Sequence, residues 1–352
     1  MPGSAKRNGV DVKLTNFDYL LELPGEEQER RWVQERLETL SVREGIILAA
    51  AAQRDPPEDM AQAINCLQLL DHYEVRVNAG SYEALGLAYL RNETRMPKNA
   101  LPFVDLEQTG RYYEDQHPGL FVGNCYVEYP RNAPQPAYQG QGSPLPEDDG
   151  WSVRLKVSSP AVPEGVWVSL PDFLDMDDTF QSEWLTLRAL HVQRWSECAL
   201  LDAQCILPEA GDLMEQYGDL ADLLYDGQEL GYVLAERGQG SPAFMEWYAA
   251  ALELEHCRNL RFALDISQNL RCYNCVSSAD LEASATGLLL DAGISEELIR
   301  ASGIDLAGYK AHLLEEEGYT LTREGTYIRR NDEEFYYSYS TPTPEQSGMM
   351  MQ

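Results

Sequence analysis

The chain has 352 residues, of which 58 are Asp or Glu and 27 are Lys or Arg, giving a formal net charge of -31 at pH 7. This excess argues against direct binding to nucleic acid or to an anionic membrane surface, because both require clustered Lys and Arg. An apolar content of 44%, with 20 Tyr and 6 Trp, excludes disorder for most of the chain.

The seven Cys are scattered through a chain that is too long to need disulfides for stability, which is typical of a reducing compartment. The first 16 residues are polar, and no window approaches 18 consecutive apolar residues. We therefore expect a cytoplasmic protein. Because its charge far exceeds what solubility requires, we expect its partners to have basic surfaces.

The pattern predicts an α+β, predominantly helical fold, built as an elongated chain of small α+β and helical subdomains in two related modules. The expected segments are a disordered tail (1–14), a truncated, mostly helical first module ending in a hairpin (15–130), a flexible to semi-extended linker rich in Pro, Gly and Gln (131–150), a small α+β subdomain (151–207), an acidic helical subdomain (208–292), a helix-hairpin subdomain (293–337) and a disordered tail (338–352).

A shift of 200 positions superposes the two halves. Identical residues coincide at Ser41 and Ser241, Ala49–Ala51 and Ala249–Ala251, Ala63 and Ala263, Gln68 and Gln268, Leu70 and Leu270, Tyr73 and Tyr273, and Asp105-Leu106 and Asp305-Leu306. One constant offset over about 65 positions indicates a repeat. Each copy is expected to hold three helices, then a closing helix and a hairpin, with a serine capping the first helix.

The second half has additional elements. Segments 151–160 and 164–171 alternate apolar and polar residues, which predicts strands, and 197–208 predicts another. A helix is expected between Asp172 and Trp195. Residues 211–237 are expected to be helical in short pieces, broken at Gly218 and Gly227, and the first half holds only a remnant of this part.

Carboxylates recur mostly every three or four residues through this acidic segment, with few compensating positive charges. We call them the acidic row: Glu209, Asp212, Glu215, Asp219, Asp222, Asp226, Glu229 and Glu236. On a helix this spacing places negative charges about 5 Å apart along one face, where like charges repel. Further acidic groups are Asp175, Asp177 and Asp178, and Glu315, Glu316 and Glu317. We interpret these side chains as partner-binding groups that stand where a protein expects phosphates.

Residues 151–330 resemble the ArdA antirestriction proteins of plasmids and conjugative transposons. The resemblance rests on EGVWVSLP, on CILPEAGDLMEQYGDLADLLYDGQELGYVLAE and on IDLAGYKAHLLEEEGYTLTREGTYI, and the first half looks like a partial copy of the same module. It implies an acidic mimic of B-form DNA that occupies the DNA-binding groove of type I restriction-modification enzymes, at the specificity and methyltransferase core, without catalysis. Family members are single modules that dimerise, so either a homodimer or an internal pseudo-dimer is open here.

Other chemistry has weaker support. Cys272 and Cys275, with His256 and Cys257, could supply four zinc ligands, but the His-Cys pair is adjacent and no second C-x-x-C follows. No nucleophile elbow, phosphate-binding loop or dinucleotide motif occurs. We therefore expect no catalytic residues, no metal and no cofactor. Two alternatives remain, namely an acidic adaptor or chaperone for basic proteins without DNA-shape mimicry, and an enzyme with an unrecognised acidic site.

Overall fold

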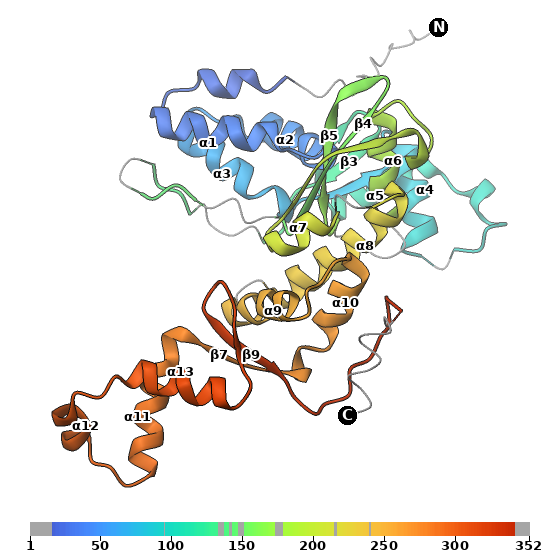
Figure 1. Cartoon of the computed structure of the whole chain (residues 1–352). Helices are drawn as coiled ribbons and strands as arrows, with labels where there is room; N and C mark the ends of the chain where they lie inside the picture. The colour runs from blue at the N-terminus through green and yellow to red at the C-terminus, as the bar shows by residue number, and fades with distance from the viewer. Residues whose placement is uncertain are drawn as a thin grey trace, which may run out of the picture. The chain divides into compact units, whose positions relative to one another are not determined.

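A computed structural model describes residues 16–94, 96–132, 137–140, 143–146, 151–172, 179–214, 217–238 and 241–341. These ranges are predominantly helical and contain three small sheets of three strands each, which confirms the predicted α+β class. None of their helices is long and apolar enough to cross a membrane. The chain forms two compact units, residues 1–201 and 202–352, and each is considered by itself (Figure 1).

Unit 1 begins with helices and ends with a sheet. Its helical elements are η1 (Asp18–Glu22), α1 (Glu27–Glu38), α2 (Val42–Arg54), α3 (Met60–Gln68), η2 (Leu70–His72), α4 (Tyr82–Asn92), η3 (Leu101–Phe103), α5 (Leu106–Gln116), α6 (Thr179–Ala189) and η4 (Trp195–Glu197). Its strands are β1 (Glu74–Val77), β2 (Gly119–Val122), β3 (Cys125–Glu128), β4 (Val153–Ser159) and β5 (Val162–Leu170), and the unit ends within β6 (Ala199–Cys205).

The core of unit 1 lies around α2, whose apolar residues Ile46, Ile47 and Leu48 are buried. Ser41 caps this helix as predicted, because its side chain accepts a hydrogen bond from the Glu44 backbone N–H while the Glu44 carboxylate accepts one from Ser41. Helix α2 packs against β5 and β3, in the two sheets ordered β5-β4-β6 and β1-β3-β2. The predicted strands β4, β5 and β6 are thereby confirmed.

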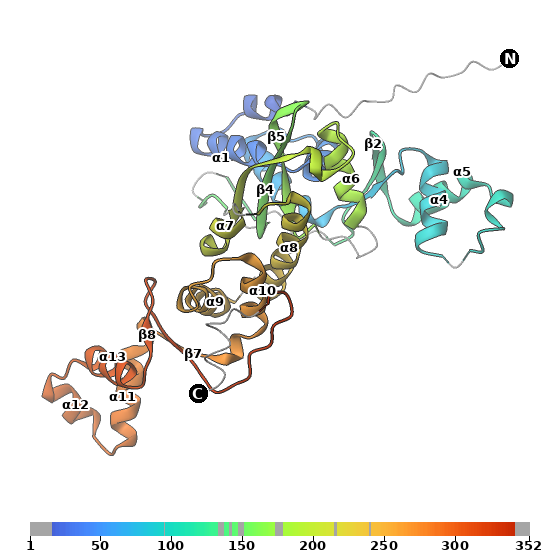
Figure 2. The same cartoon turned by 45° about the vertical axis from the view of Figure 1, so that its right-hand side comes forward.

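Unit 2 contains several helices and one small sheet of three strands. Its helical elements are α7 (Pro208–Met214), α8 (Leu220–Val233), the π-helical turn η5 (Leu234–Gly238), α9 (Pro242–Leu254), α10 (Leu260–Gln268), η6 (Leu270–Cys272), η7 (Ser278–Asp280), α11 (Leu281–Asp291), α12 (Glu296–Ser302) and α13 (Leu306–Glu316). Its strands are β7 (Tyr273–Ser277), β8 (Thr320–Leu321) and β9 (Thr326–Arg330). Figure 2 shows the β7-β9-β8 sheet between the α9–α10 pair and the α11–α13 group.

The repeat is present in three dimensions at the predicted offset of 200. Helices α2, α3, α4 and α5 correspond to α9, α10, α11 and α13, and the sheet order β1-β3-β2 corresponds to β7-β9-β8. The caps of α5 and α13 also correspond, since Asp105 accepts from the Gln108 backbone N–H at 3.0 Å and Asp305 from that of Gly308 at 2.9 Å. The predicted serine cap of α9 is wrong, because the Ser241 side chain makes no cap hydrogen bond. We name residues 41–140 repeat 1 and residues 241–340 repeat 2.

After its hairpin, the chain of each repeat runs back along one helix, which is α3 in repeat 1 and α10 in repeat 2. In repeat 1, Asn65 donates to the Tyr138 carbonyl at 2.9 Å and accepts from its N–H at 3.0 Å. In repeat 2, the fully buried Asp265 accepts from the backbone N–H groups of Ser338, Tyr339 and Ser340 at 2.6–2.9 Å. We call residues 331–341 the return strap. Each strap also places a tyrosine hydroxyl on a carboxylate: Tyr138 donates to Glu29 and Tyr339 to Glu229, where the glutamates keep the offset of 200 and the tyrosines are shifted by one residue.

Several boundaries differ from the predictions. Described parts of the expected 131–150 linker pack on the helical part of unit 1: Tyr138 is buried, and Trp32 donates to the Pro146 carbonyl at 2.8 Å. The compact units divide at 201/202, within β6 and not at the expected linker. Strands β1 and β7 and helix α12 were not predicted, since four- to seven-residue segments are too short to show a period. The expected tail 1–14 and residues 342–352 of the expected tail 338–352 lie outside the described residues, whereas the backbone at the start of that second tail is bonded to Asp265.

Candidate partner-binding surface

The acidic row begins on two helices that do not form one continuous face. Helix α7 ends at Met214 and α8 begins at Leu220, so the predicted break at Gly218 is confirmed. The predicted break at Gly227 is wrong, because α8 runs through it and Gly227 is buried. Glycine weakens a helix by only about 0.5–1 kcal/mol relative to alanine, which packing against α10 can offset.

Four members of the row are exposed to solvent: Asp212, Asp219, Asp222 and Glu236. Asp219 is the N-cap of α8 and accepts from the Ala221 N–H at 2.8 Å, while its negative charge also suits the positive end of the helix dipole. Glu209 and Glu229 are half-buried. Glu215 lies outside the described residues.

Asp226 corrects the prediction of a fully exposed row. Its side chain is only 2% exposed, and it accepts hydrogen bonds from the Tyr217 hydroxyl at 2.6 Å and from Arg261 Nε at 2.7 Å. These bonds raise the pKa of Arg261, because the hydrogen bond to Asp226 and its negative charge both favour the charged guanidinium. Asp226 therefore holds α10 against α8 and is not available to a partner.

Arg261 also lies 3.4 Å from the exposed carboxylate of Asp222, so one positive charge lies beside two members of the row. Sequence reasoning missed this, since Arg261 follows the row by many residues and only the packing of α10 on α8 brings it near. Arg237, the one positive charge that the sequence places within the segment, instead donates to the Ser267 carbonyl at 3.0 Å.

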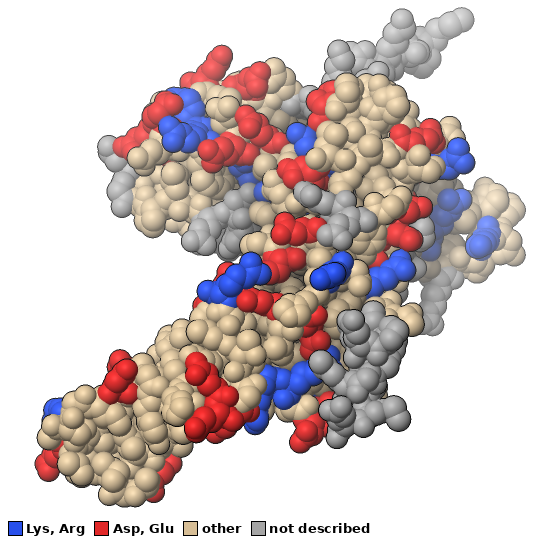
Figure 3. All heavy atoms as spheres, viewed as in Figure 1, with Lys and Arg blue, Asp and Glu red and all other residues tan. Residues whose placement is uncertain are grey.

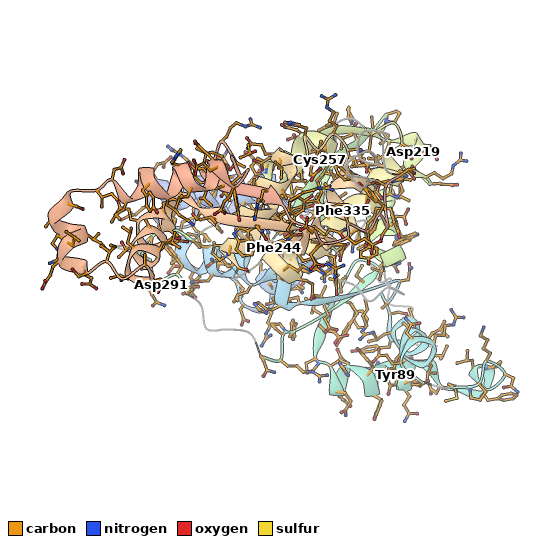
Figure 4. All side chains as sticks on the ribbon, turned by 60° about the horizontal axis from the view of Figure 1, so that its bottom comes forward. Tyr89, Asp219, Phe244, Cys257, Asp291 and Phe335 are labelled. Carbon is orange, nitrogen blue, oxygen red and sulfur yellow. The ribbon has the colours of Figure 1, made fainter. Side chains whose placement is uncertain are left out.

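The other predicted acidic groups do not extend the row. Glu315, Glu316 and Glu317 are all exposed at the end of α13, where the helix dipole disfavours negative charge. Asp219, at the start of α8, and Asp291, at the end of α11, lie well apart within unit 2 (Figure 4), and α13 packs on α11. Asp175, Asp177 and Asp178 lie outside the described residues.

Acidic side chains outnumber basic ones on the face shown in Figure 3, but the two kinds are interspersed over much of it. Unit 2 is the more acidic part: its sequence from residue 202 onward holds 27 Asp and Glu and 9 Lys and Arg. Such a surface attracts basic partners over a distance of about 8–10 Å at moderate salt.

Two exposed tyrosines on α8 were not predicted as surface groups. Tyr225 is 66% exposed and Tyr232 is 52% exposed, although neighbouring Leu223, Leu230 and Val233 are buried. Helical spacing gave a signal for them, because they lie three residues after Asp222 and three after Glu229.

The thiols considered as zinc ligands have other partners. Cys272 donates to the Glu334 carbonyl and Cys257 to that of Asn259. Burial raises the pKa of Cys257 and of Cys275 to about 12, which keeps these thiols protonated near neutral pH. In the part of the chain that the structure describes, no three His, Cys, Asp or Glu side chains are grouped closely enough to hold a metal.

Comparison with known proteins identifies no relative: no family model, curated protein or solved structure matches the chain.

Proposed function

We propose that this chain is a non-enzymatic inhibitor that binds a DNA-handling protein by placing carboxylates in its phosphate-binding groove. The observation that carries the proposal is the exposed acidic surface on a folded scaffold, with Asp212, Asp219, Asp222 and Glu236 open to solvent. An ordered carboxylate pays less entropy on binding than a flexible acidic tail does. The ArdA resemblance makes the core of a type I restriction-modification enzyme the proposed target.

The burial of Asp226 limits how closely α8 can copy DNA. Asp222 and Glu229 are seven residues apart, which corresponds to about 10 Å along the helix. One strand of B-form DNA carries roughly three phosphates over that rise. Helix α8 can therefore match selected phosphate sites in a groove and leave others empty. We expect its contribution to binding to depend on where its carboxylates lie as well as on their charge.

The exposed Tyr225 and Tyr232 favour a second candidate, an acidic adaptor that binds basic proteins without copying DNA. Tyrosines are enriched among the residues that dominate protein interfaces. The two functions differ in one respect: only a DNA mimic competes with DNA for the same groove.

Competition with DNA tests the proposal. The chain is titrated into a type I restriction methyltransferase core bound to a labelled duplex, over a salt series. We expect the duplex to be displaced, with an apparent affinity that falls steeply as salt rises. A complex that forms without displacing DNA would support the adaptor, and the absence of any complex at low salt would refute both functions.

A charge-matched pair of variants locates the surface. The test variant carries Asp212→Asn, Asp219→Asn, Asp222→Asn and Glu236→Gln, and Asn at position 219 retains the helix cap. The control variant carries four changes at exposed glutamates of unit 1: Glu35→Gln, Glu58→Gln, Glu83→Gln and Glu164→Gln. Both remove four negative charges, so we expect inhibition to weaken by about 4-fold to several hundred-fold in the test variant only, at about 0.2–1 kcal/mol per ion pair. Equal weakening in both would assign the effect to net charge alone.

A further inference from the structure

Helix α8 presents an alternating face of carboxylates and tyrosines. Asp222, Tyr225, Glu229 and Tyr232 follow one another at steps of three, four and three residues. At 100° per residue these four positions fall within an arc of about 80°. The two tyrosines are well exposed and Asp222 is exposed, while Glu229 is half-buried.

The tyrosines of this face make few contacts within the described residues, where Tyr225 interacts electrostatically with the Tyr339 hydroxyl. Neither hydroxyl makes a hydrogen bond, and neither ring contacts another ring or a cation, in the described parts of the chain. Glu229 accepts a 3.3 Å hydrogen bond from the Tyr339 hydroxyl, which restrains its carboxylate without removing its charge. Large exposed aromatic groups among carboxylates are typical of a surface that a partner covers.

The same protein shows what this combination of groups binds. Within the described residues, four arginines each pair with a carboxylate and lie over a tyrosine ring: Arg54 with Asp55 and Tyr129, Arg76 with Glu128 and Tyr113, Arg111 with Glu107 and Tyr82, and Arg330 with Glu255 and Tyr273. Arg111 lies on the surface, where its guanidinium is 2.8 Å from the Glu107 carboxylate and 4.1 Å from the Tyr82 ring centroid. A planar guanidinium satisfies both contacts at once, whereas an ammonium group is a strongly hydrated point charge.

We propose that the face formed by Asp222, Tyr225, Glu229 and Tyr232 binds arginine side chains of a basic partner protein, each guanidinium stacking on a tyrosine and donating to the neighbouring carboxylate. The inference rests on the proposed function and narrows it, because it states that the partner is recognised through arginine in preference to lysine. A second copy of this chain is the poorer occupant, since unit 2 holds 27 acidic and 9 basic residues and two such surfaces repel.

The test uses two probes, an oligo-arginine and an oligo-lysine peptide of equal length, with affinities measured by fluorescence anisotropy at several salt concentrations. We expect the full chain to bind the arginine peptide about 5- to 30-fold more tightly, from two exposed cation–π contacts. Replacing both tyrosines with Leu should reduce this ratio to near one and leave the lysine affinity unchanged. Replacing both with Phe keeps the rings and should preserve the ratio.

Tyr112→Leu is the matched control, because this tyrosine is 55% exposed on α5 of unit 1. Its ratio should equal that of the wild type, and unfolding midpoints should be alike for all variants. Equal binding of the two peptides by the wild type, or a ratio that survives both Leu changes, would overturn the inference and leave the acidic function standing. If neither peptide binds at low salt, the proposed function fails as well. Self-association that disappears in the Leu variant would show that a second copy occupies the face and would also overturn it.

Discussion

The buried carboxylate of Asp265 gives the sharpest test of how unit 2 is held together. It accepts four hydrogen bonds from the return strap, three from backbone N–H groups and one from the Ser340 hydroxyl at 2.6 Å. Asp265→Ala removes every one of these acceptors. The freed N–H groups face α10, so they can form hydrogen bonds to water only if the strap lifts away from this helix. The strap is partly exposed, which makes such a movement feasible.

Lifting the strap has its own cost, which sets the size of the effect. Phe335 is buried against Phe262, with ring centroids 6.0 Å apart, and exposing such a side chain costs about 1.5–3 kcal/mol. Asn269 also holds Tyr336 through two backbone contacts of 2.8 and 3.0 Å. The Ala variant either leaves the strap N–H groups unpaired or loses the contacts of Phe335 and Tyr336. It also removes the free-energy cost of burying the charge of Asp265, which offsets part of the loss. We expect a loss of about 3 kcal/mol in the free energy of unfolding.

Urea unfolding followed by far-UV circular dichroism measures this loss, and limited proteolysis reports whether the strap has detached. Asp265→Asn is the informative comparison, because Asn65 fills the same place in repeat 1. It retains an oxygen acceptor but turns an amide donor toward the N–H groups, so its loss should be smaller, about 1–2 kcal/mol. An Ala variant that unfolds at the wild-type urea concentration, with an equally protected strap, would show that the four bonds contribute nothing net.

Three further predictions concern packing and charge. Gly86→Ala should destabilise unit 1 by about 1–3 kcal/mol, because a Cβ there would lie 2.2 Å from a backbone oxygen of α5. By contrast, a Cβ at Gly287 in α11 meets nothing within 4 Å, so Gly287→Ala should stabilise unit 2 by about 0.5–1 kcal/mol. Thermal unfolding of both variants checks the contrast. Asp226→Asn should cost about 3 kcal/mol in stability and leave peptide binding per folded molecule unchanged, and weaker binding at full folding would place Asp226 in the interface. Burial alone would raise the pKa of Glu44, but Arg36 and Ser41 outweigh burial and lower that pKa. The contribution of Glu44 to the free energy of unfolding is therefore complete above the unfolded pKa of about 4.3 and is lost as pH falls through the folded pKa. Urea unfolding measured from pH 6 to pH 3 should show this loss, and Glu44→Gln should abolish this part of the pH dependence.

Much of the architecture could be predicted because it depends on local signals. The constant offset located both repeats, and Ser41 marked a helix start through a side-chain cap that acts within three residues. Strands β4 and β5 showed a clear alternation. By contrast, β1 and β7 each pair with a strand about fifty residues later, so their short sequences carry little sign of their conformation.

The candidate surface was harder to predict, since spacing along a helix defines faces but not which face is covered. Asp222 and Asp226 are one turn apart and are equally acidic, yet one is exposed and the other is 2% exposed. The difference arises from Arg261 and Tyr217, which reach Asp226 only after α10 has packed on α8. The same packing leaves Tyr225 and Tyr232 facing solvent.

The sequence by itself therefore determined the charge, the duplication and the helical class, because each is carried by composition or by contacts between near neighbours. Tertiary structure alone decided which carboxylates a partner can reach and which ones hold the protein together. The physical reason is that burying a charge is costly unless another segment supplies donors, and those donors come from parts of the chain that only folding brings together.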